Sequence, residues 1–181
     1  FALLDADRIR GISSEELLLD EVQDMDYGHF PVLRECLSHS KYGLERYTGT
    51  PKTFENTLEA LWLQSSMAEW CIPCAACNHT NVACTNCDLD KMIGPYRKDI
   101  SESFPATVCA KCSRMINPKT GFWLHGRPEK RVDFAGYHVP QPIMSIHYSR
   151  PEKWAQLLAK REGQGNYTPQ RYYNEVLGES C

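Results

Sequence analysis

Apolar runs and helical spacings follow one another in the first part of the chain, a pattern that predicts strands and helices in turn. Leu17–Leu19 is short and wholly apolar, which is typical of a strand buried on both faces of a parallel sheet. Phe30, Leu33 and Leu37 then recur at the spacing of one helix face. Residues 44–48 predict a second short strand, which the turn sequence GTPKT ends.

A second helix is predicted next, with Leu58, Leu61 and Trp62 on one face and its start at Thr53 or Asn56. Strand, helix, strand, helix is the order found in a parallel sheet with crossover helices. The first part of the chain is therefore expected to belong to the α/β class.

The pattern changes after residue 70, where cysteine, asparagine and threonine replace the aliphatic periodicity. A small segment with few aliphatic residues needs something other than an apolar core to hold it together. Two later helices are predicted, one from Pro151 and one from Thr168 and Pro169 that ends at Gly178. The chain is thus expected to comprise an α/β part at 1–70, a cysteine-rich module at 71–125 and a segment with two helices at 126–181.

Composition narrows the class of protein. The 181 residues include 42% hydrophobic and 24% charged side chains, an ordinary globular balance. No run of about 18 apolar residues occurs, so no membrane span is predicted and no membrane partner is expected. The chain begins with Phe1 rather than Met and ends at Cys181, and we interpret it as a fragment with both ends missing.

Charge is unevenly distributed, although the net charge is only −3. Residues 1–35 carry nine acidic and three basic side chains, whereas residues 91–131 carry nine basic and three acidic ones. A basic middle segment can face a phosphate backbone. Charge alone favours the alternative, a solvated surface. The candidate DNA-contacting side chains are Lys111, Arg114, Lys119, Arg127, Lys130 and Arg131.

Two adjacent carboxylates, Asp20 and Glu21, directly follow the first apolar strand. In nucleoside triphosphatases such a strand delivers one carboxylate to Mg²⁺ and another to the attacking water, at a rigid and partly dry site. The alternative is a buried strand that simply ends at the surface, and the pair alone favours this alternative. The next strand ends in Thr48, Gly49 and Thr50, which either sense a γ-phosphate or only form a tight turn.

Seven of the nine cysteines lie between Cys71 and Cys112, mostly as Cys-x-x-Cys pairs. This clustering is typical of metal binding in a reducing compartment rather than of a disulfide framework. Two such pairs that turn toward one point supply four thiolates for a tetrahedral Zn²⁺. The alternatives are a redox pair or free thiols.

The pair formed by Cys109 and Cys112 has two candidate partner pairs. Cys77 is separated from Cys109 by 31 residues, and Cys87 is separated from it by 21. The shorter gap is closer to the usual ribbon spacing, so spacing alone slightly favours the pair ending at Cys87. A second ion is also conceivable, and its candidate ligands are Cys84, Cys87, Cys71 and His79.

Several motifs in a fixed order resemble the large terminase subunit of tailed bacteriophages, the motor that packages DNA into capsids. They are RGISSEELLLDEVQDM, YTGTPKTFENTLEALW, SSMAEWCIPCAAC, GYHVPQ and YYNEVLG, and they span nearly the whole chain. The resemblance implies that Leu17–Glu21 is a Walker B strand, with Asp20 for magnesium and Glu21 as the catalytic carboxylate. It further implies that Thr48-Gly49-Thr50 is the coupling motif and that these residues bind nucleotide together with Asp20.

The resemblance also implies an architecture: the back half of a parallel-sheet P-loop-type ATPase domain, a zinc-ribbon module and a helical linker to a nuclease domain. It prefers Cys74, Cys77, Cys109 and Cys112 as the zinc ligands. The phosphate-binding loop and the nuclease carboxylates would lie outside the fragment, which is expected to be inactive alone. The implied cofactors are ATP, Mg²⁺ and structural Zn²⁺.

The implied partners are double-stranded DNA, the portal protein, the small terminase subunit and further copies of the chain in a ring. The implied location is the cytoplasm of an infected bacterium and, transiently, the procapsid portal. Two alternatives stay open. DEVQD also resembles motif II of superfamily 1 helicases, but YTGTPKT stands where those would show Gly-Asp-x-x-Gln. The other alternative is a zinc-ribbon nucleic-acid-binding protein without hydrolase activity.

Overall fold

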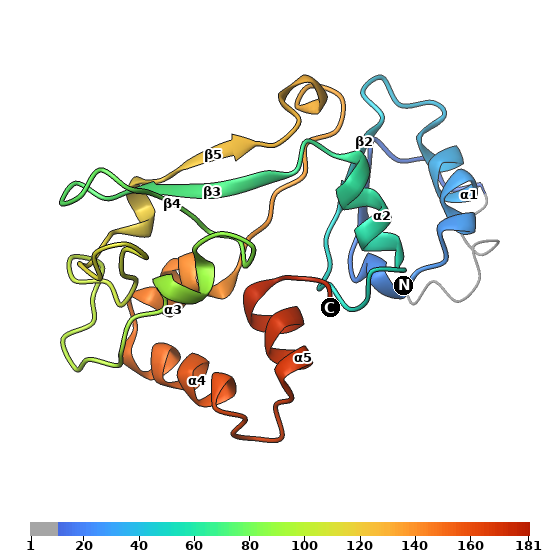
Figure 1. Cartoon of the computed structure of the whole chain (residues 1–181). Helices are drawn as coiled ribbons and strands as arrows, with labels where there is room; N and C mark the ends of the chain where they lie inside the picture. Colours follow the sequence, from blue (N-terminus) through green and yellow to red (C-terminus); the bar gives the residue numbers. More distant parts are fainter. Residues whose placement is uncertain (1–10) are drawn as a thin grey trace. The chain divides into compact units, whose positions relative to one another are not determined.

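A computed structural model describes residues 11–181 of the chain, which form a mixed α/β structure with short strands (Figure 1). The chain divides into a first unit that ends at Leu61 and a second unit from Trp62 to Cys181. The boundary falls within helix α2 (Thr57–Gln64). The cysteine-rich module and the two later helices, which the sequence suggested as separate parts, belong to the same second unit.

In the first unit, strand β1 (Glu16–Leu19) pairs in parallel with β2 (Leu44–Tyr47), as the order of elements predicts. The connection between them contains helix α1 (Phe30–Arg34), which continues as a 3₁₀ turn over Glu35–Leu37. The helical spacing seen in the sequence is thereby confirmed. Because the two strands are parallel, their carboxyl ends lie at the same edge of the sheet.

Within residues 11–61 the strand pair is covered on one face only, so the expectation of a strand buried on both faces is wrong for this part of the chain. Leu19 is buried on the face where the ring of Phe30 stacks on that of Tyr47, with centroids 5.5 Å apart. On the opposite face, Leu18 is 64% exposed and Leu44 is 48% exposed. Helix α1 packs against a single face, and among residues 11–61 the other face stays open to solvent. The strand therefore alternates between buried and exposed positions.

Helix α2 begins at the second of its two expected starts. The Asn56 side-chain oxygen accepts a hydrogen bond from the Glu59 amide at 2.9 Å, which is the bond of an N-cap. The Thr57 hydroxyl donates to the Met25 carbonyl at 2.6 Å. This bond ties the first turn of α2 to the segment that follows β1.

The second unit contains a three-stranded antiparallel sheet in the order β4-β3-β5. Its central strand β3 (Ala68–Pro73) runs directly into the first cysteine pair, and β4 (Thr80–Val82) returns from that pair. Strand β5 (Phe122–His125) lies along the other side of β3 (Figure 1). The sheet thus positions the cysteine-rich segment at one of its ends.

One hydrophobic core joins the cysteine-rich segment to the helices that follow it. These are α3 (Ser145–Tyr148), α4 (Pro151–Arg161) and α5 (Pro169–Tyr172), the last continuing as a π-helical turn over Tyr173–Leu177. Trp154 is fully buried, and its indole N–H donates to the Gly94 carbonyl at 2.9 Å. The shared core includes Ile72, Cys74, Leu89, Met92, Cys109, Trp154, Leu157, Val176 and Leu177.

The start and end of the last helix agree with the sequence. The Thr168 hydroxyl accepts a hydrogen bond from the Arg171 amide at 3.1 Å, and Gly178 ends the helix with a φ of 71°. Among the described helices, from residue 11 onward, each is too short or too polar to cross a bilayer.

A buried histidine connects three distant segments of the second unit. Nδ1 of His138 lies 2.7 Å from a carboxylate oxygen of Glu69 in β3, and its Nε2 lies 2.6 Å from the Leu177 carbonyl. Burial opposes the charge of this imidazole, but the hydrogen bond and charge of Glu69 outweigh it and raise the pKa of His138. With both nitrogens protonated, the ring donates at each end.

We expect His138→Gln to destabilise the chain by about 2 kcal/mol near pH 6, the usual worth of a hydrogen bond to a charged group. A raised folded-state pKa contributes stability that is complete below the ordinary histidine pKa and is lost as pH rises through the folded value. The difference from wild type should therefore shrink toward alkaline pH in urea unfolding followed at several pH values. The exposed His39→Gln variant serves as the control, and a difference that stays constant with pH would contradict the charged form.

Candidate functional site

Four cysteines of the second unit converge on one point. The sulfur atoms of Cys74, Cys77, Cys109 and Cys112 all lie within 4.8 Å of one another. Cys74 Sγ is 3.7 Å from Cys112 Sγ, and Cys77 Sγ is 3.7 Å from Cys109 Sγ. Tetrahedral zinc–sulfur bonds of about 2.3 Å place sulfurs about 3.8 Å apart. The four thiols can therefore hold a metal ion, and their spacing is consistent with a structural zinc.

The first cysteine pair is held by a specific backbone turn. The Cys74 amide donates to the His79 carbonyl at 2.8 Å, and the Asn78 amide donates back to the Cys74 carbonyl at 2.9 Å. Asn78 adopts a left-handed conformation with a φ of 56°, which asparagine tolerates better than most residues. The turn directs both sulfurs of the pair to the same side.

The second pair repeats this turn. The Cys109 amide donates to the Arg114 carbonyl at 2.8 Å, and the Ser113 amide donates back to the Cys109 carbonyl at 2.9 Å. Ser113 has a φ of 58°, in the position that matches Asn78. Two turns with the same hydrogen bonds therefore bring their cysteines to one cluster, an arrangement that suits a four-thiolate metal site.

A buried asparagine that the sequence analysis did not single out joins the two turns. Asn81 in β4 is fully buried, and its side-chain nitrogen donates to the Ile72 carbonyl at 2.9 Å. Its side-chain oxygen accepts a hydrogen bond from the Ala110 amide, inside the second pair, at 2.7 Å. Such supporting bonds fix the position of the ligands around a metal. In the sequence, Asn81 is marked only as a polar residue within a short strand.

The electrostatics of the cluster suit a cation. Burial raises the pKa of Cys74, but the amides of Ala76 and Cys77 outweigh burial and lower that pKa to about 7. The pKa of Cys109 is lowered against burial in the same way. The His79 amide lowers the pKa of Cys77, but burial and the neighbouring thiols raise it to about 12. Cys74 and Cys109 therefore ionise more readily than free thiols, whereas ionisation of Cys77 needs a positive charge beside it.

The competing pair lies outside this cluster. In the part of the chain from residue 11 to residue 181, no second group of three or more ligands comes together. His79, a candidate for a second ion, instead lies 3.0 Å from a carboxylate oxygen of Asp88. Burial and the neighbouring Cys87 raise the pKa of Cys84, which keeps it protonated. The slight preference that spacing gave to Cys84 and Cys87 is therefore wrong for this cluster.

A second group of polar side chains lies in the first unit, at the carboxyl ends of β1 and β2. The Thr48 hydroxyl donates to the Asp20 carboxylate at 2.5 Å, so residues 28 positions apart in the sequence are in contact. The backbone continues the pairing of the strands, since the Val22 amide donates to the Thr48 carbonyl at 3.1 Å. Both predicted segments, the acid pair and the Thr-Gly-Thr turn, therefore meet at one edge of the sheet.

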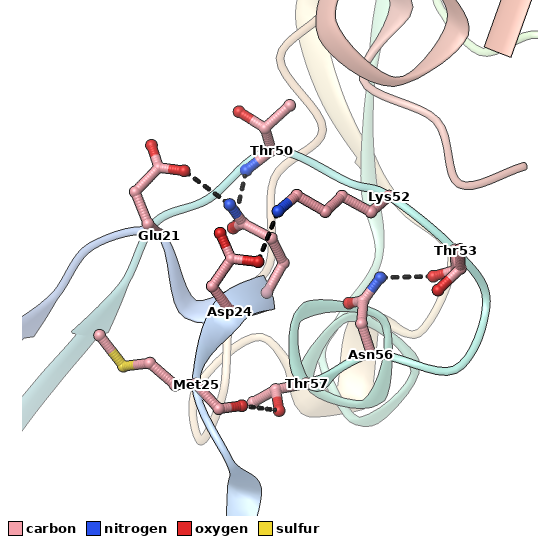
Figure 2. A network of polar contacts seen from close by, with 9 residues as sticks. Glu21, Asp24, Met25, Thr50, Lys52, Thr53, Asn56 and Thr57 are labelled. Carbon is pink, nitrogen blue, oxygen red and sulfur yellow. Dashed lines mark hydrogen bonds and ion pairs between the residues drawn. The ribbon is translucent and has the colours of Figure 1, made fainter. Parts of the chain in front are cut away.

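Glu21 reaches the same turn through a residue that the sequence analysis did not assign. The side-chain nitrogen of Gln23 donates to the Glu21 carboxylate at 2.6 Å, and its oxygen accepts the Thr50 amide at 3.1 Å. Figure 2 shows Glu21 and Thr50, whose dashed hydrogen bonds both lead to the unlabelled side chain between them, beside the ion pair of Lys52 with Asp24. The available signal was an amide side chain two residues after the acid pair.

The strand-end carboxylates are accessible to water. Asp20, Glu21 and Thr48 are exposed, whereas Val22 and Gln23 beside them are buried. The expectation of a dry site is therefore not met within the described residues. Within residues 11–61 the sheet has two strands, and Asp20 and Glu21 are exposed although Leu19 and Val22 on either side of them are buried.

The basic side chains singled out in the sequence all lie on the surface of the second unit. Lys119 is 3.9 Å from a carboxylate oxygen of Glu102, and Arg127 donates to the Leu63 carbonyl. Arg127 and Lys130 also line a pocket of about 400 Å³ together with Asp133. The exposed set is Lys111, Arg114, Lys119, Arg127, Lys130 and Arg131.

Comparisons with protein-family models, with curated proteins and with solved structures found no match for this chain. The four-cysteine cluster and the polar group at the strand ends are thus the two observations on which a function can rest. The first is a complete ligand set. The second brings carboxylate, hydroxyl and amide groups together at the ends of two parallel strands.

We expect one zinc equivalent per chain, lost in Cys109→Ser, because a removed thiolate leaves three ligands and an open position. Cys87→Ser is the matched control, and it should keep its zinc because Cys87 lies outside the cluster. Elemental analysis of the purified variants measures both. Loss of zinc in Cys87→Ser as well as in Cys109→Ser would move the site to the competing pair, and full retention in Cys109→Ser would contradict the cluster.

Proposed function

We propose that the chain is a piece of the large terminase subunit of a tailed bacteriophage, an ATP-hydrolysing motor that moves double-stranded DNA into a capsid. The observation that carries the proposal is the meeting of the acid pair with the Thr-Gly-Thr turn at the ends of two adjacent parallel strands. Asp20 contacts Thr48 directly, and Glu21 is connected to Thr50 through Gln23. An acid pair that merely ends a surface strand has no need of polar partners from the next strand.

Each residue has a role in the proposed reaction. Asp20 holds Mg²⁺, with Thr48 fixing the carboxylate from the neighbouring strand, and Glu21 orients the attacking water. When bound, the magnesium ion neutralises charge on the phosphates of ATP. Thr48, Gly49 and Thr50 lie beside these carboxylates and respond to the state of the nucleotide. The exposure of the carboxylates is compatible with this role if the phosphate-binding loop of a longer protein covers them.

We further propose that the four-cysteine cluster holds a structural zinc. Four protein ligands leave no open coordination position, so the ion has no place to activate water. Its ligands Cys74 and Cys109 belong to the core that also contains Trp154 and Leu177. The zinc then fixes the sheet and the following helices as one body. In the terminase this body connects the motor to a nuclease that lies outside the chain.

The remaining partners follow from the terminase assignment: the portal protein, the small terminase subunit and other copies of the chain in a ring, within an infected bacterium. One observation favours a second function, a zinc-ribbon protein that binds nucleic acid without hydrolysis. Lys111, inside the second cysteine pair, and Arg114 just after it are both exposed. Four thiolates with Zn²⁺ carry a net charge of about −2, which these cations would offset.

In the full-length protein, we expect Glu21→Gln to lower ATP turnover by about 10²–10⁴-fold, the usual contribution of a positioned acid or base. Binding of ATP should stay within about twofold, because glutamine keeps the size of the side chain and removes only its charge. Steady-state hydrolysis and equilibrium nucleotide binding measure the two effects.

Glu55→Gln is the matched control, since Glu55 is an exposed carboxylate of the same unit, and its turnover should equal that of wild type. Unchanged turnover in Glu21→Gln would refute the catalytic role. Nucleic-acid binding without any ATP hydrolysis in the wild-type protein would favour the zinc-ribbon alternative.

A further inference from the structure

Gln23 is the buried polar side chain at the tip of β1. It lies in the 3₁₀ turn Val22–Asp24 and is 7% exposed, while the carboxylates of Glu21 and Asp24 on either side are exposed. A buried amide is costly unless its donor and acceptor are both used. Here both are used, and by two different segments of the chain: the acid pair on one side and the Thr-Gly-Thr turn on the other.

The orientation of the amide follows from its partners. The Glu21 carboxylate can only accept, so the nitrogen of Gln23 must face it, at 2.6 Å. The Thr50 backbone amide can only donate, so the oxygen of Gln23 must face it, at 3.1 Å. If the amide were flipped, its oxygen would face the Glu21 carboxylate and its NH₂ group would face the Thr50 N–H, so neither hydrogen bond could form. Gln23 is therefore held in one orientation by both ends together.

Glu21 itself is held in a conformation that costs energy. Its φ of 55° and ψ of 42° are left-handed, a region that glutamate adopts rarely. Its amide donates to the Asp20 carboxylate at 3.0 Å, and its own carboxylate receives the bond from Gln23. These two bonds offset the strain.

Gly49 leaves the space in which the amide lies. A Cβ atom at this position would come within 2.3 Å of the Gln23 side-chain oxygen and within 3.3 Å of the Val22 amide nitrogen and a Leu58 methyl carbon. The close contact involves the far end of a flexible side chain, so alanine at this position moves the amide rather than the strands. Gly49, the middle residue of the Thr-Gly-Thr turn, thus leaves room for the Gln23 amide because it has no side chain.

We propose that Gln23 is a positioning residue that couples the side chain of Glu21 to the backbone of Thr50, so that the two shift together. The proposal rests on the function proposed above for Glu21. When Glu21 turns toward the attacking water, its bond to Gln23 is lost and the amide is released from one end. Thr50 then loses a fixed acceptor, and the Thr-Gly-Thr turn becomes free to move. Gln23 makes the turn sensitive to the position of the catalytic carboxylate without touching nucleotide.

Hydrogen exchange at the Thr50 amide tests the link in the 181-residue chain, without nucleotide. Gln23→Met keeps the length of the side chain and removes the acceptor, and Gly49→Ala displaces the amide. Both should speed exchange at Thr50 by about tenfold, the upper range for one hydrogen bond. Exchange at the Ala60 amide, bonded within α2, should not change and shows that the unit stays folded.

The decisive variant is Glu21→Ala, which cuts the far end of the bridge. We expect it to speed Thr50 exchange about threefold, because an amide held at one end is a less fixed acceptor. Glu55→Ala is the matched control and should have no effect. In a Gln23→Met background, where the bridge is already absent at both ends, the effect of Glu21→Ala should vanish. If Glu21→Ala leaves Thr50 exchange at the wild-type rate, the proposed coupling is wrong.

A kinetic readout separates this proposal from the proposed ATPase. In the full-length protein, Gln23→Met and Gly49→Ala should each lower kcat for ATP about tenfold, with KM within about twofold, because they misplace Glu21 rather than the nucleotide. If Gln23→Met changes the KM for ATP but keeps the wild-type kcat, the positioning role is overturned. If the protein hydrolyses no ATP while Glu21→Ala still alters Thr50 exchange, the ATPase fails and the mechanical link stands.

Discussion

The parallel pairing of β1 with β2 is the constraint on which the strand-end site depends. An antiparallel pair would place the end of β1 beside the start of β2, and the acid pair would then face Leu44 instead of Thr48. In the parallel register, Leu19 lies opposite Tyr47, so the residues that follow each strand emerge together. The helix between the strands makes this pairing possible, because its apolar face covers the sheet side that carries Leu19.

The second unit depends on a different interaction, the convergence of four sulfur atoms. The segment between the two cysteine pairs is long and contributes only part of a core, and the rest comes from α3, α4 and the last helix. A metal that fixes the two turns therefore also fixes the surface on which those helices pack. His138 provides a second connection in the same unit, because it links β3 to the end of the last helix. The four-cysteine cluster and the contacts of His138 thus belong to one body.

The sequence predicted the elements well where local signals decide them. The spacing of Phe30 and Leu33, the cap at Thr168 and the end at Gly178 are confirmed because each reports the backbone directly. Burial was harder to predict. Leu18 belongs to an apolar run, yet it is exposed because, within residues 11–61, one face of the sheet receives no helix. A run of leucines does not reveal how many faces of a strand are covered.

For the candidate sites too, the sequence predicted what local signals decide and missed what depends on distant segments. The number and pairing of cysteines indicated a metal site, but spacing alone could not decide between two pairs, since the loop length does not say where the chain turns back. Gln23 and Asn81 were missed because each acts through partners from another segment. Side-chain bridges of this kind become visible only when the fold brings those segments together. The terminase resemblance pointed to the carboxylates but not to the amide of Gln23, which joins Glu21 to Thr50.

The most direct test of the central claim replaces magnesium by Mn²⁺ in the nucleotide-bound full-length protein and measures paramagnetic broadening of backbone amide resonances. If Asp20 holds the metal at the ends of β1 and β2, the resonances of Glu21, Thr48 and Thr50 should broaden most, and Asp20→Asn should remove the effect. Broadening confined to other parts of the protein, with these three resonances sharp, would contradict the account.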